Sequence, residues 1–285
     1  MAPARDDAAR ALLDFYQEAG VDALVGETPV DRFADDPPAA TAPSPSPIAR
    51  TGISARDVAV PPNRPLPSRE PGPAPRAPAP PPPSPETAVM AAREAAKCAA
   101  TLDALRAILV GFEGCALRMT ATQLVFADGN PAARVMFVGE APGRDEDIEG
   151  LPFVGRSGKL LDRMMAAIGL DRSSAYIANI VPWRPPGNRT PTPQESAICL
   201  PFTKRQIELA NPDVLVCMGQ PATQTLLGTT DGITKTRGRL FKYHTGTREI
   251  RAIATFHPAY LLRQPLQKRL AWRDFLAIKK ALATS

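Results

Sequence analysis

The first segment that could carry chemistry runs from residue 135 to residue 158 and couples an apolar run to a polar loop. Glu140 and Glu146 follow the apolar run, and a lone aromatic residue, Phe153, lies further along the loop. Carboxylates in such a loop can move protons, and the ring of Phe153 can either stack on a planar ligand or simply pack against its neighbours. Because ligands of open α/β sheets bind outside the carboxyl ends of the strands, we expect a site in this loop.

Two later segments place single polar side chains in a similar setting. Asn179 lies inside the apolar run 175–181, and His257 directly follows the apolar run 248–256. A buried amide costs free energy unless it is hydrogen-bonded, so Asn179 either makes a structural hydrogen bond or contacts a ligand. His257 is likewise either a structural residue or a hydrogen-bond donor at the end of a strand. His244, the other histidine, is expected at the surface.

The glycines of the first segment do not match the nucleotide-binding fingerprints. Gly139 and Gly143 are separated by three residues, unlike the spacing in G-x-G-x-x-G. Lys159 is followed by Leu160 instead of Ser or Thr, and Phe153 stands where a Walker A glycine would fall. Both fingerprints therefore fail.

Strands alternate with helices over the second half of the chain, a pattern typical of a parallel sheet covered on both faces. We expect strands over 134–139, 175–181, 214–218 and 248–256, and helices over 86–107, 158–168, 193–210, 221–227 and 267–283. A further strand near 239–244 would form an antiparallel hairpin. The predicted fold class is α/β, a three-layer α/β/α sandwich around a central, mainly parallel four-stranded sheet.

The composition predicts three parts. Of the 33 prolines, 18 lie between residues 37 and 85, and such a chain buries too little apolar surface to fold. We therefore expect a disordered linker over 34–85. Before it, residues 1–33 include an amphipathic helix over 6–19, which would dock on the folded domain or on a partner protein. The folded domain would span 86–285.

Charge and hydropathy favour a nucleic-acid partner and exclude a membrane span. Residues 1–85 carry a net charge of −3, whereas residues 86–285 carry +8, as expected of a domain that meets phosphate backbones. No apolar run is long enough for a membrane helix, and no signal peptide is evident. We expect a cytoplasmic monomer whose cysteines stay reduced. These cysteines are Cys98, Cys115, Cys199 and Cys217.

Taken in order, the three segments resemble the three motifs of family 4 uracil-DNA glycosylases. The matching stretches are Val135–Asp147 with Leu151–Gly158, Ile177–Arg189, and Thr255–Arg263. The resemblance implies a glycosylase-like catalytic domain over 86–285 that hydrolyses the N-glycosidic bond of uracil in DNA. The product would be an abasic site in base excision repair, and the partner would be uracil-containing DNA, single- or double-stranded.

The resemblance also assigns roles to individual residues. Phe153 becomes the platform on which a flipped base stacks, and Gly139 and Ala141 belong to the base-binding loop. Asn179 becomes the residue that reads uracil, since an amide can donate to O4 and accept from N3–H, whereas cytosine presents the opposite pattern. His257 becomes the donor to O2 of the departing base, where negative charge develops.

The group that orients the attacking water is left open by this comparison. Some members of the superfamily carry an Asp just after the first strand, but Ala141 follows Glu140 here. Glu140, Glu146 and Asn188 are the candidates. The two glutamates could instead cap or pair with neighbouring groups such as Arg144.

Two loops are expected to touch DNA, and two other functions remain open. An inserted apolar or arginine side chain can offset part of the cost of extruding a base. The candidates are Arg184, Arg189, Leu261, Leu262 and Arg263, which could equally be solvated surface. The alternatives are a glycosylase for another deaminated base, such as hypoxanthine or xanthine, and a non-catalytic nucleic-acid-binding module.

The cysteines depart from the family pattern. Typical members hold a [4Fe–4S] cluster with four cysteines, and a cubane needs four thiolates. Here Cys115 and Cys199 match two ligand positions, whereas Phe112 and Trp183 replace the other two. We therefore expect no metal and no cofactor, with apolar packing where the cluster would be.

Overall fold

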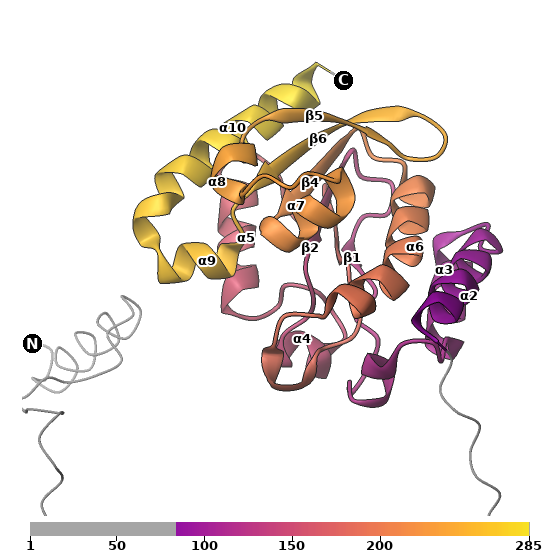
Figure 1. Cartoon of the computed structure of the whole chain (residues 1–285). Helices are drawn as coiled ribbons and strands as arrows, with labels where there is room; N and C mark the ends of the chain where they lie inside the picture. The colour runs from indigo at the N-terminus through magenta and orange to yellow at the C-terminus, as the bar shows by residue number, and fades with distance from the viewer. Residues whose placement is uncertain (1–83, 285) are drawn as a thin grey trace, which may run out of the picture. The chain divides into compact units, whose positions relative to one another are not determined.

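A computed structural model describes residues 84–284 of the chain (Figure 1). The helix expected over 6–19 and the linker up to residue 83 lie outside the described residues. Within the described part, strands β1 to β6 form one sheet in the order β1-β3-β2-β4-β6-β5. The strands are β1 (Asp128–Gly129), β2 (Val135–Gly139), β3 (Tyr176–Asn179), β4 (Val214–Met218), β5 (Leu240–His244) and β6 (Glu249–Thr255).

The helices include both long packing helices and short ones at the strand ends. They are α2 (Pro85–Lys97), α3 (Leu102–Gly111), α4 (Arg144–Glu149), α5 (Arg156–Ala166), α6 (Pro193–Ala210), α7 (Gln220–Leu227), α8 (Ile233–Thr236), α9 (Pro258–Arg263) and α10 (Lys268–Ala283). Short 3₁₀ turns cover Ala116–Met119, Pro186–Asn188 and Pro265–Gln267. None of the helices in residues 84–284 combines the length and the apolar character that a bilayer crossing requires.

The four central strands are parallel, as predicted, and the two edge strands are antiparallel. β3, β2, β4 and β6 run in one direction, with Val138 paired to Cys217 and Cys217 paired to Ala254. β5 pairs with β6 in the expected hairpin, and β1 adds a short edge strand beside β3 that the sequence pattern did not predict. From β2 the chain passes to β3 on one side and then to β4 on the other. Such a switch in direction creates a crevice at the carboxyl ends of the strands.

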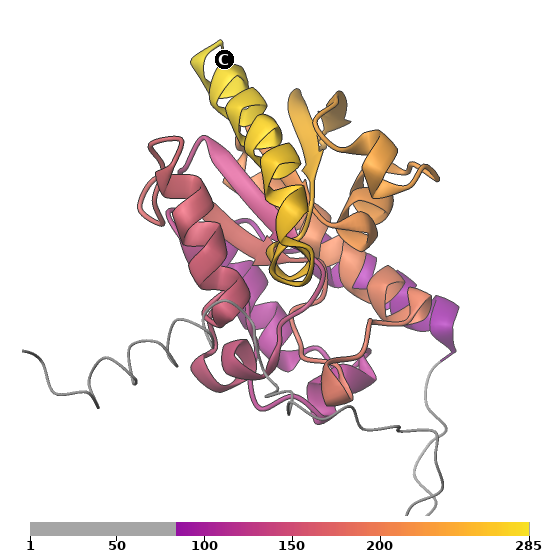
Figure 2. The ribbon, with the colours of Figure 1, turned by 90° about the vertical axis from the view of Figure 1, so that its left-hand side faces the viewer.

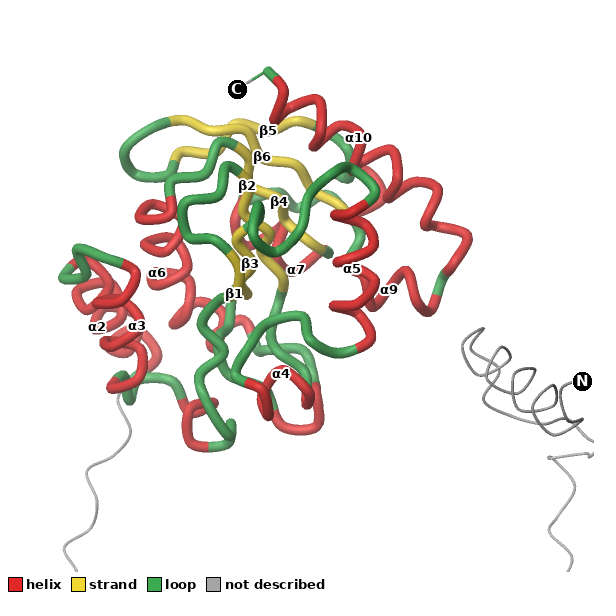
Figure 3. Tube along the Cα trace, turned by 180° about the vertical axis from the view of Figure 1, so that it is seen from behind, coloured by secondary structure: helices red, strands yellow, loops and turns green. Residues whose placement is uncertain are grey.

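Helices cover both faces of this sheet, so the predicted three-layer α/β/α sandwich is confirmed. On one face, α5 and α10 pack on β2 through Leu161, Met165 and Phe275. On the other face, α6 and α7 pack on the sheet, with Ile198 and Phe202 of α6 in the core. Figure 2 shows α5 and α10 together on one side of the sheet, and Figure 3 shows α2 and α3 beyond α6.

The predicted helix over 86–107 is two helices, because a capping residue interrupts it. The hydroxyl of Thr101 accepts a hydrogen bond from the Ala104 amide at 3.1 Å and begins α3 after α2 has ended. Ser84 caps α2, which begins at Pro85, so the last two residues of the predicted linker belong to the folded part. α6 has the expected bounds, with Thr192 and Glu195 forming a capping box.

Candidate active site

A cavity of about 430 Å³ opens at the carboxyl ends of the central strands. Each of four neighbouring strands delivers a residue to its wall at or just beyond the strand end: Glu140 after β2, Asn179 at the end of β3, Gly219 after β4 and His257 after β6. The cavity therefore lies where the chain changes from one side of β2 to the other, at the carboxyl ends of the strands, where the sequence predicted a site.

Phe153 lies in the cavity wall in a constrained backbone conformation. Its φ of 56° is in the left-handed region, and its ring centroid lies 5.4 Å from that of His257. A Cβ at position 158 would lie 1.6 Å from the Phe153 carbonyl oxygen, so only glycine fits at Gly158. At Gly139, an added Cβ would lie within 2.6 Å of both the Phe153 ring and the Asn179 amide oxygen. These two glycines let the ring and the amide approach each other.

Asn179 places a buried amide oxygen at the cavity. The residue is only 4% exposed, and its Oδ1 has no hydrogen-bond partner among the described residues. An unsatisfied buried polar atom costs about 1–3 kcal/mol, so one that lines a cavity indicates a ligand that donates to it. Of the two explanations that the sequence left open, the geometry favours contact with a ligand.

Glu140 has a similar unsatisfied oxygen. Its Oε1 is buried without a hydrogen-bond partner in the part of the chain that the structure describes. Burial raises the pKa of the Glu140 carboxyl, and a hydrogen bond from the Thr190 side chain opposes that rise. Thr190 lines the same cavity and was not among the predicted residues, since a lone threonine in a loop gives no sequence signal.

Glu146 also lines the cavity, but its carboxylate is occupied by backbone donors. It accepts hydrogen bonds from the amides of Gly143 at 3.0 Å, Val154 at 3.1 Å and Gly155 at 3.0 Å. The carboxylate thereby joins the start of α4 to the loop that carries Phe153. This matches the capping alternative and leaves Glu146 poorly placed to orient water.

His257 caps the short helix α9 and is held in its neutral form. Its Nδ1 accepts a hydrogen bond from the Ala259 amide at 3.2 Å, so the proton of the neutral ring is on Nε2. Burial lowers the pKa of His257 to about 4, and the positive charge of Arg263 adds to the effect. At neutral pH the ring therefore offers an uncharged Nε2–H donor at the cavity.

The predicted DNA-contacting arginines differ in their surroundings. Arg263 and Arg189 line the cavity, and Arg189 also forms an ion pair with Glu195 at 2.6 Å. Arg184 lies outside the cavity lining and donates to Asn188 Oδ1 at 2.6 Å. Asn188 lines the cavity, but this bond occupies its amide oxygen, which makes it a weak candidate for holding water.

The two leucines of the third motif point in different directions. Leu262 is partly exposed, whereas Leu261 is fully buried against Phe256 and Ala271. The prediction that Leu261 touches DNA is therefore wrong, because the helical phase of α9 turns it into the core. Leu266, just beyond the motif, is 85% exposed and was not predicted.

The residues at the expected cluster positions do not fit a [4Fe–4S] cluster. Cys115 and Cys199 are both buried free thiols, and the neighbouring Cys115 thiol together with burial raises the pKa of Cys199 well above its ordinary value. Phe112 packs edge-on against Phe202 with ring centroids 4.9 Å apart, and Trp183 is buried in the same part of the hydrophobic core.

The remaining cysteines do not complete a ligand set. Cys98 is exposed at the end of α2, and Cys217 is buried within β4. Among residues 84–284, no three His, Cys, Asp or Glu side chains come together as metal ligands. Two thiols alone do not make a cubane site.

Comparisons with known proteins agree with this geometry. The family model of the uracil DNA glycosylase superfamily matches residues 126–276. The type-4 uracil-DNA glycosylase of Archaeoglobus fulgidus is 40% identical over 182 residues, which cover 62% of this chain and 92% of that protein. The type-4 enzyme of Thermotoga maritima is 46% identical over 150 residues, 52% of this chain and 77% of that protein. The one from Sulfurisphaera tokodaii is 36% identical over 189 residues, 65% of this chain and 86% of that protein. The segment that the family model matches contains every residue of the cavity wall. This chain therefore belongs to the uracil-DNA glycosylase superfamily.

Proposed function

We propose that the protein is a monofunctional DNA glycosylase that removes uracil from DNA by hydrolysing its N-glycosidic bond, as the first step of base excision repair. The observation that carries the proposal is the unsatisfied amide oxygen of Asn179, buried at a cavity that Phe153 and His257 also line. The relatives named type-4 uracil-DNA glycosylases support the same activity.

Base selection would rest on Phe153 and Asn179. Stacking on the Phe153 ring stabilises any flipped base by roughly 1–3 kcal/mol and does not discriminate. The Asn179 amide then accepts from N3–H of uracil and donates to O4. Cytosine would put an acceptor against the amide oxygen and a donor against the amide nitrogen, so both contacts would be lost.

Bond cleavage would depend on His257. The C1′–N1 bond breaks with positive charge on the sugar and negative charge on O2 of the departing base. A neutral Nε2–H donor aimed at O2 strengthens as that charge grows, so it stabilises the transition state more than the ground state. Because the pKa of His257 is about 4, the ring is neutral at pH 7. It would therefore act as a hydrogen-bond donor and would not transfer a proton to the base.

Glu140 is the group best suited to orient the attacking water. Of the three candidates, only Glu140 keeps a buried oxygen without a partner in the described residues. Glu146 accepts from three backbone amides, and Asn188 accepts from Arg184. A carboxylate held beside the sugar also favours the positive charge that develops there.

The DNA would lie across the cavity mouth. Arg263, Arg189 and Arg184 would meet phosphates, and Leu262 would fill part of the gap left by the extruded nucleotide. We propose that the protein acts as a monomer on cellular DNA in the cytoplasm. The catalytic domain would be residues 86–285.

We further propose that the protein works without an iron–sulfur cluster. Two ligand positions hold the buried apolar side chains of Phe112 and Trp183 instead of cysteines, which supports this departure from the family. Protein purified anaerobically should be colourless, without the broad absorbance near ~400 nm that thiolate-bound iron gives. A brown preparation with about four irons per chain would contradict the proposal.

The decisive test of activity is incubation with an oligonucleotide containing one uracil, followed by alkaline cleavage at abasic sites. We expect strand scission at the uracil position and none in a matched oligonucleotide with thymine. Parallel substrates with hypoxanthine and xanthine test the other bases. Scission at hypoxanthine or xanthine but not at uracil would favour the alternative substrate, and no scission with any of them would favour a binding module.

A further inference from the structure

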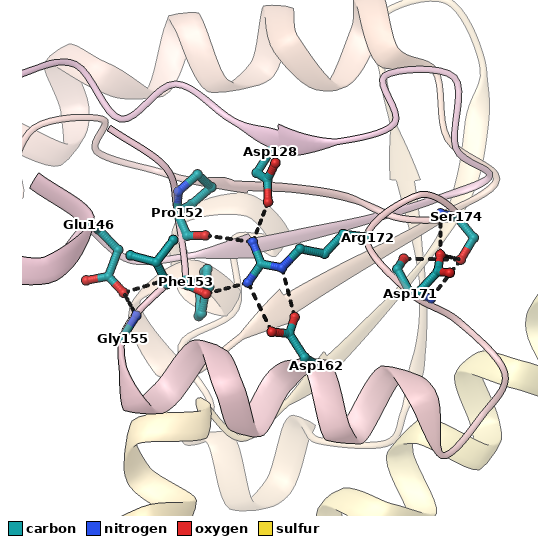
Figure 4. A network of polar contacts seen from close by, with 10 residues as sticks. Asp128, Glu146, Pro152, Phe153, Gly155, Asp162, Asp171, Arg172 and Ser174 are labelled. Carbon is teal, nitrogen blue, oxygen red and sulfur yellow. Dashed lines mark hydrogen bonds and ion pairs between the residues drawn. The ribbon is translucent and has the colours of Figure 1, made fainter. Parts of the chain in front are cut away.

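One arginine outside the cavity lining gathers contacts from three parts of the chain. Arg172 lies in the turn between α5 and β3, and its guanidinium donates to the carbonyls of Pro152, at 3.2 Å, and Phe153. It also forms ion pairs with Asp128 of β1 and with Asp162 of α5, the latter at 2.9 Å. Figure 4 shows this guanidinium between the two carboxylates and the two carbonyls.

The two carboxylates fix the charge and the orientation of the guanidinium. Burial opposes the charge, but the hydrogen bonds to Asp128 and Asp162 outweigh burial and raise the pKa of Arg172. With those N–H groups directed to the carboxylates, the remaining ones face the Pro152–Phe153 loop. A lysine could not reproduce this arrangement, because an ammonium lacks the planar set of donors.

The carbonyls that Arg172 holds belong to the strained part of the site. The left-handed φ of Phe153 costs of order 1–3 kcal/mol for a residue other than glycine, and it persists only where the surroundings impose it. Gly158 leaves room for the Phe153 carbonyl, and Arg172 donates a hydrogen bond to it. Glu146 holds the next two amides of the same loop.

We propose that Arg172 is a positioning residue that acts through Phe153: it fixes the base-stacking ring in its binding geometry before DNA arrives. The inference rests on the proposed function, because it assumes that a base stacks on Phe153. Arg172 is not among the residues that line the cavity, so it would not touch the substrate. Its loss should therefore affect only the steps in which a base occupies the cavity.

The test is a double-mutant cycle between Arg172→Gln and Phe153→Ala, with single-turnover release of uracil as the readout. Alone, Arg172→Gln should lower the single-turnover rate roughly 5- to 150-fold, the range for losing one base–aromatic contact. In the Phe153→Ala background the same substitution should change the rate by less than about twofold, because contacts that act through each other are not additive. Equal effects in both backgrounds would overturn the inference.

A second readout separates positioning from general damage. DNA that contains an abasic site offers no base to stack, so Arg172→Gln should leave its affinity within about twofold of the parent protein. Weaker binding of abasic DNA in parallel with the lost rate would contradict a role through Phe153.

The chain offers a matched control in Arg248. This arginine also donates to two carbonyls, those of Asn211 and Pro212, and pairs with Asp213. It directly precedes β6, at the end of the sheet opposite to the cavity. Arg248→Gln removes a comparable network and should leave uracil release unchanged. If Arg172→Gln does not fold, Asp162→Asn is the second variant: it removes one of the two ion pairs that orient the Arg172 guanidinium, at a more exposed position. Asp162→Asn should then show a smaller loss in the same cycle, and additivity there would equally reject the proposal.

Failure of this inference can be told apart from failure of the proposed function. If Phe153→Ala releases uracil at the parent rate, the stacking role of Phe153 is wrong whatever Arg172 does. If Phe153→Ala is slow but Arg172→Gln is not, the function stands and only the positioning role is rejected.

Discussion

The cavity and the cysteine pair deal with buried volume in opposite ways. At the cavity, two buried oxygens, from Glu140 and Asn179, have no hydrogen-bond partner among the described residues. Around Cys115 and Cys199, the space is filled by large apolar side chains, including Trp183. Unsatisfied buried atoms lower stability and are retained where a ligand completes them. The contrast indicates that the first region is built to receive a molecule and the second to hold the fold together.

The largest effect should come from emptying the packed region. Trp183→Ala removes a buried indole and should lower the free energy of unfolding by about 3–5 kcal/mol, measured by chemical denaturation. The other tryptophan, Trp272, is 45% exposed on α10, and Trp272→Ala should cost far less. Equal losses in the two variants would show that the region around the cysteines is not a packing centre.

Removing the donor from the cavity should affect the reaction. His257→Ala should raise the barrier of the chemical step by about 2–4 kcal/mol, the usual consequence of losing one donor to a developing oxyanion. Single-turnover release of uracil measures this loss. His244→Ala serves as the control, because His244 is exposed on β5. A wild-type rate for His257→Ala would end the assignment.

Changing the base reader should have a smaller effect and should alter selectivity. Asn179→Asp replaces the amide donor with a carboxyl oxygen, which should reduce the stabilisation of the transition state for uracil release by roughly 1–3 kcal/mol. The same change should let some cytosine bind. Release rates from oligonucleotides with uracil and with cytosine test both effects. Asn130→Asp, at an exposed asparagine outside the cavity, is the matched control. Unchanged rate and selectivity in Asn179→Asp would remove Asn179 from the site.

The smallest effect concerns pH. Folding lowers the pKa of His257 from 6.5 to about 4. Between pH 6.5 and pH 4 the unfolded chain therefore binds more protons than the folded protein. The free energy of unfolding is therefore highest above about pH 6.5, where His257 is neutral in both states, and it falls as the pH drops toward 4. Between about pH 7 and pH 5.5 this amounts to about 1 kcal/mol, and His257→Gln should remove it. Thermal unfolding of both proteins at the two pH values measures the difference, and identical pH dependence would contradict a His257 that its surroundings keep neutral.

Much of the fold and of the site could be predicted because local patterns carried them. The parallel strands are continuous apolar runs, and Asn179 and His257 lie at strand ends where ligands bind. Other features had no local signal. β1 has only two residues, so it shows no periodicity.

The errors in the site have the same origin. Leu261 was assigned to DNA because the motif alone does not fix the phase of the short helix α9, which turns this side chain inward. Arg172 was missed because its partners, from Asp128 to Asp162, are scattered along the chain and meet only in the fold.

The order of the strands also governs how the chain can fold during synthesis. β2 lies between β3 and β4, and Val135 pairs with Val214, which is made long after it. All five residues of β2 are buried in the finished protein, so one apolar edge of the nascent sheet stays open until β4 has left the ribosome. β4 in turn waits for β6. Assembly of the centre of the molecule is therefore a late and non-local event, and an incomplete chain presents a strand edge that is prone to aggregation.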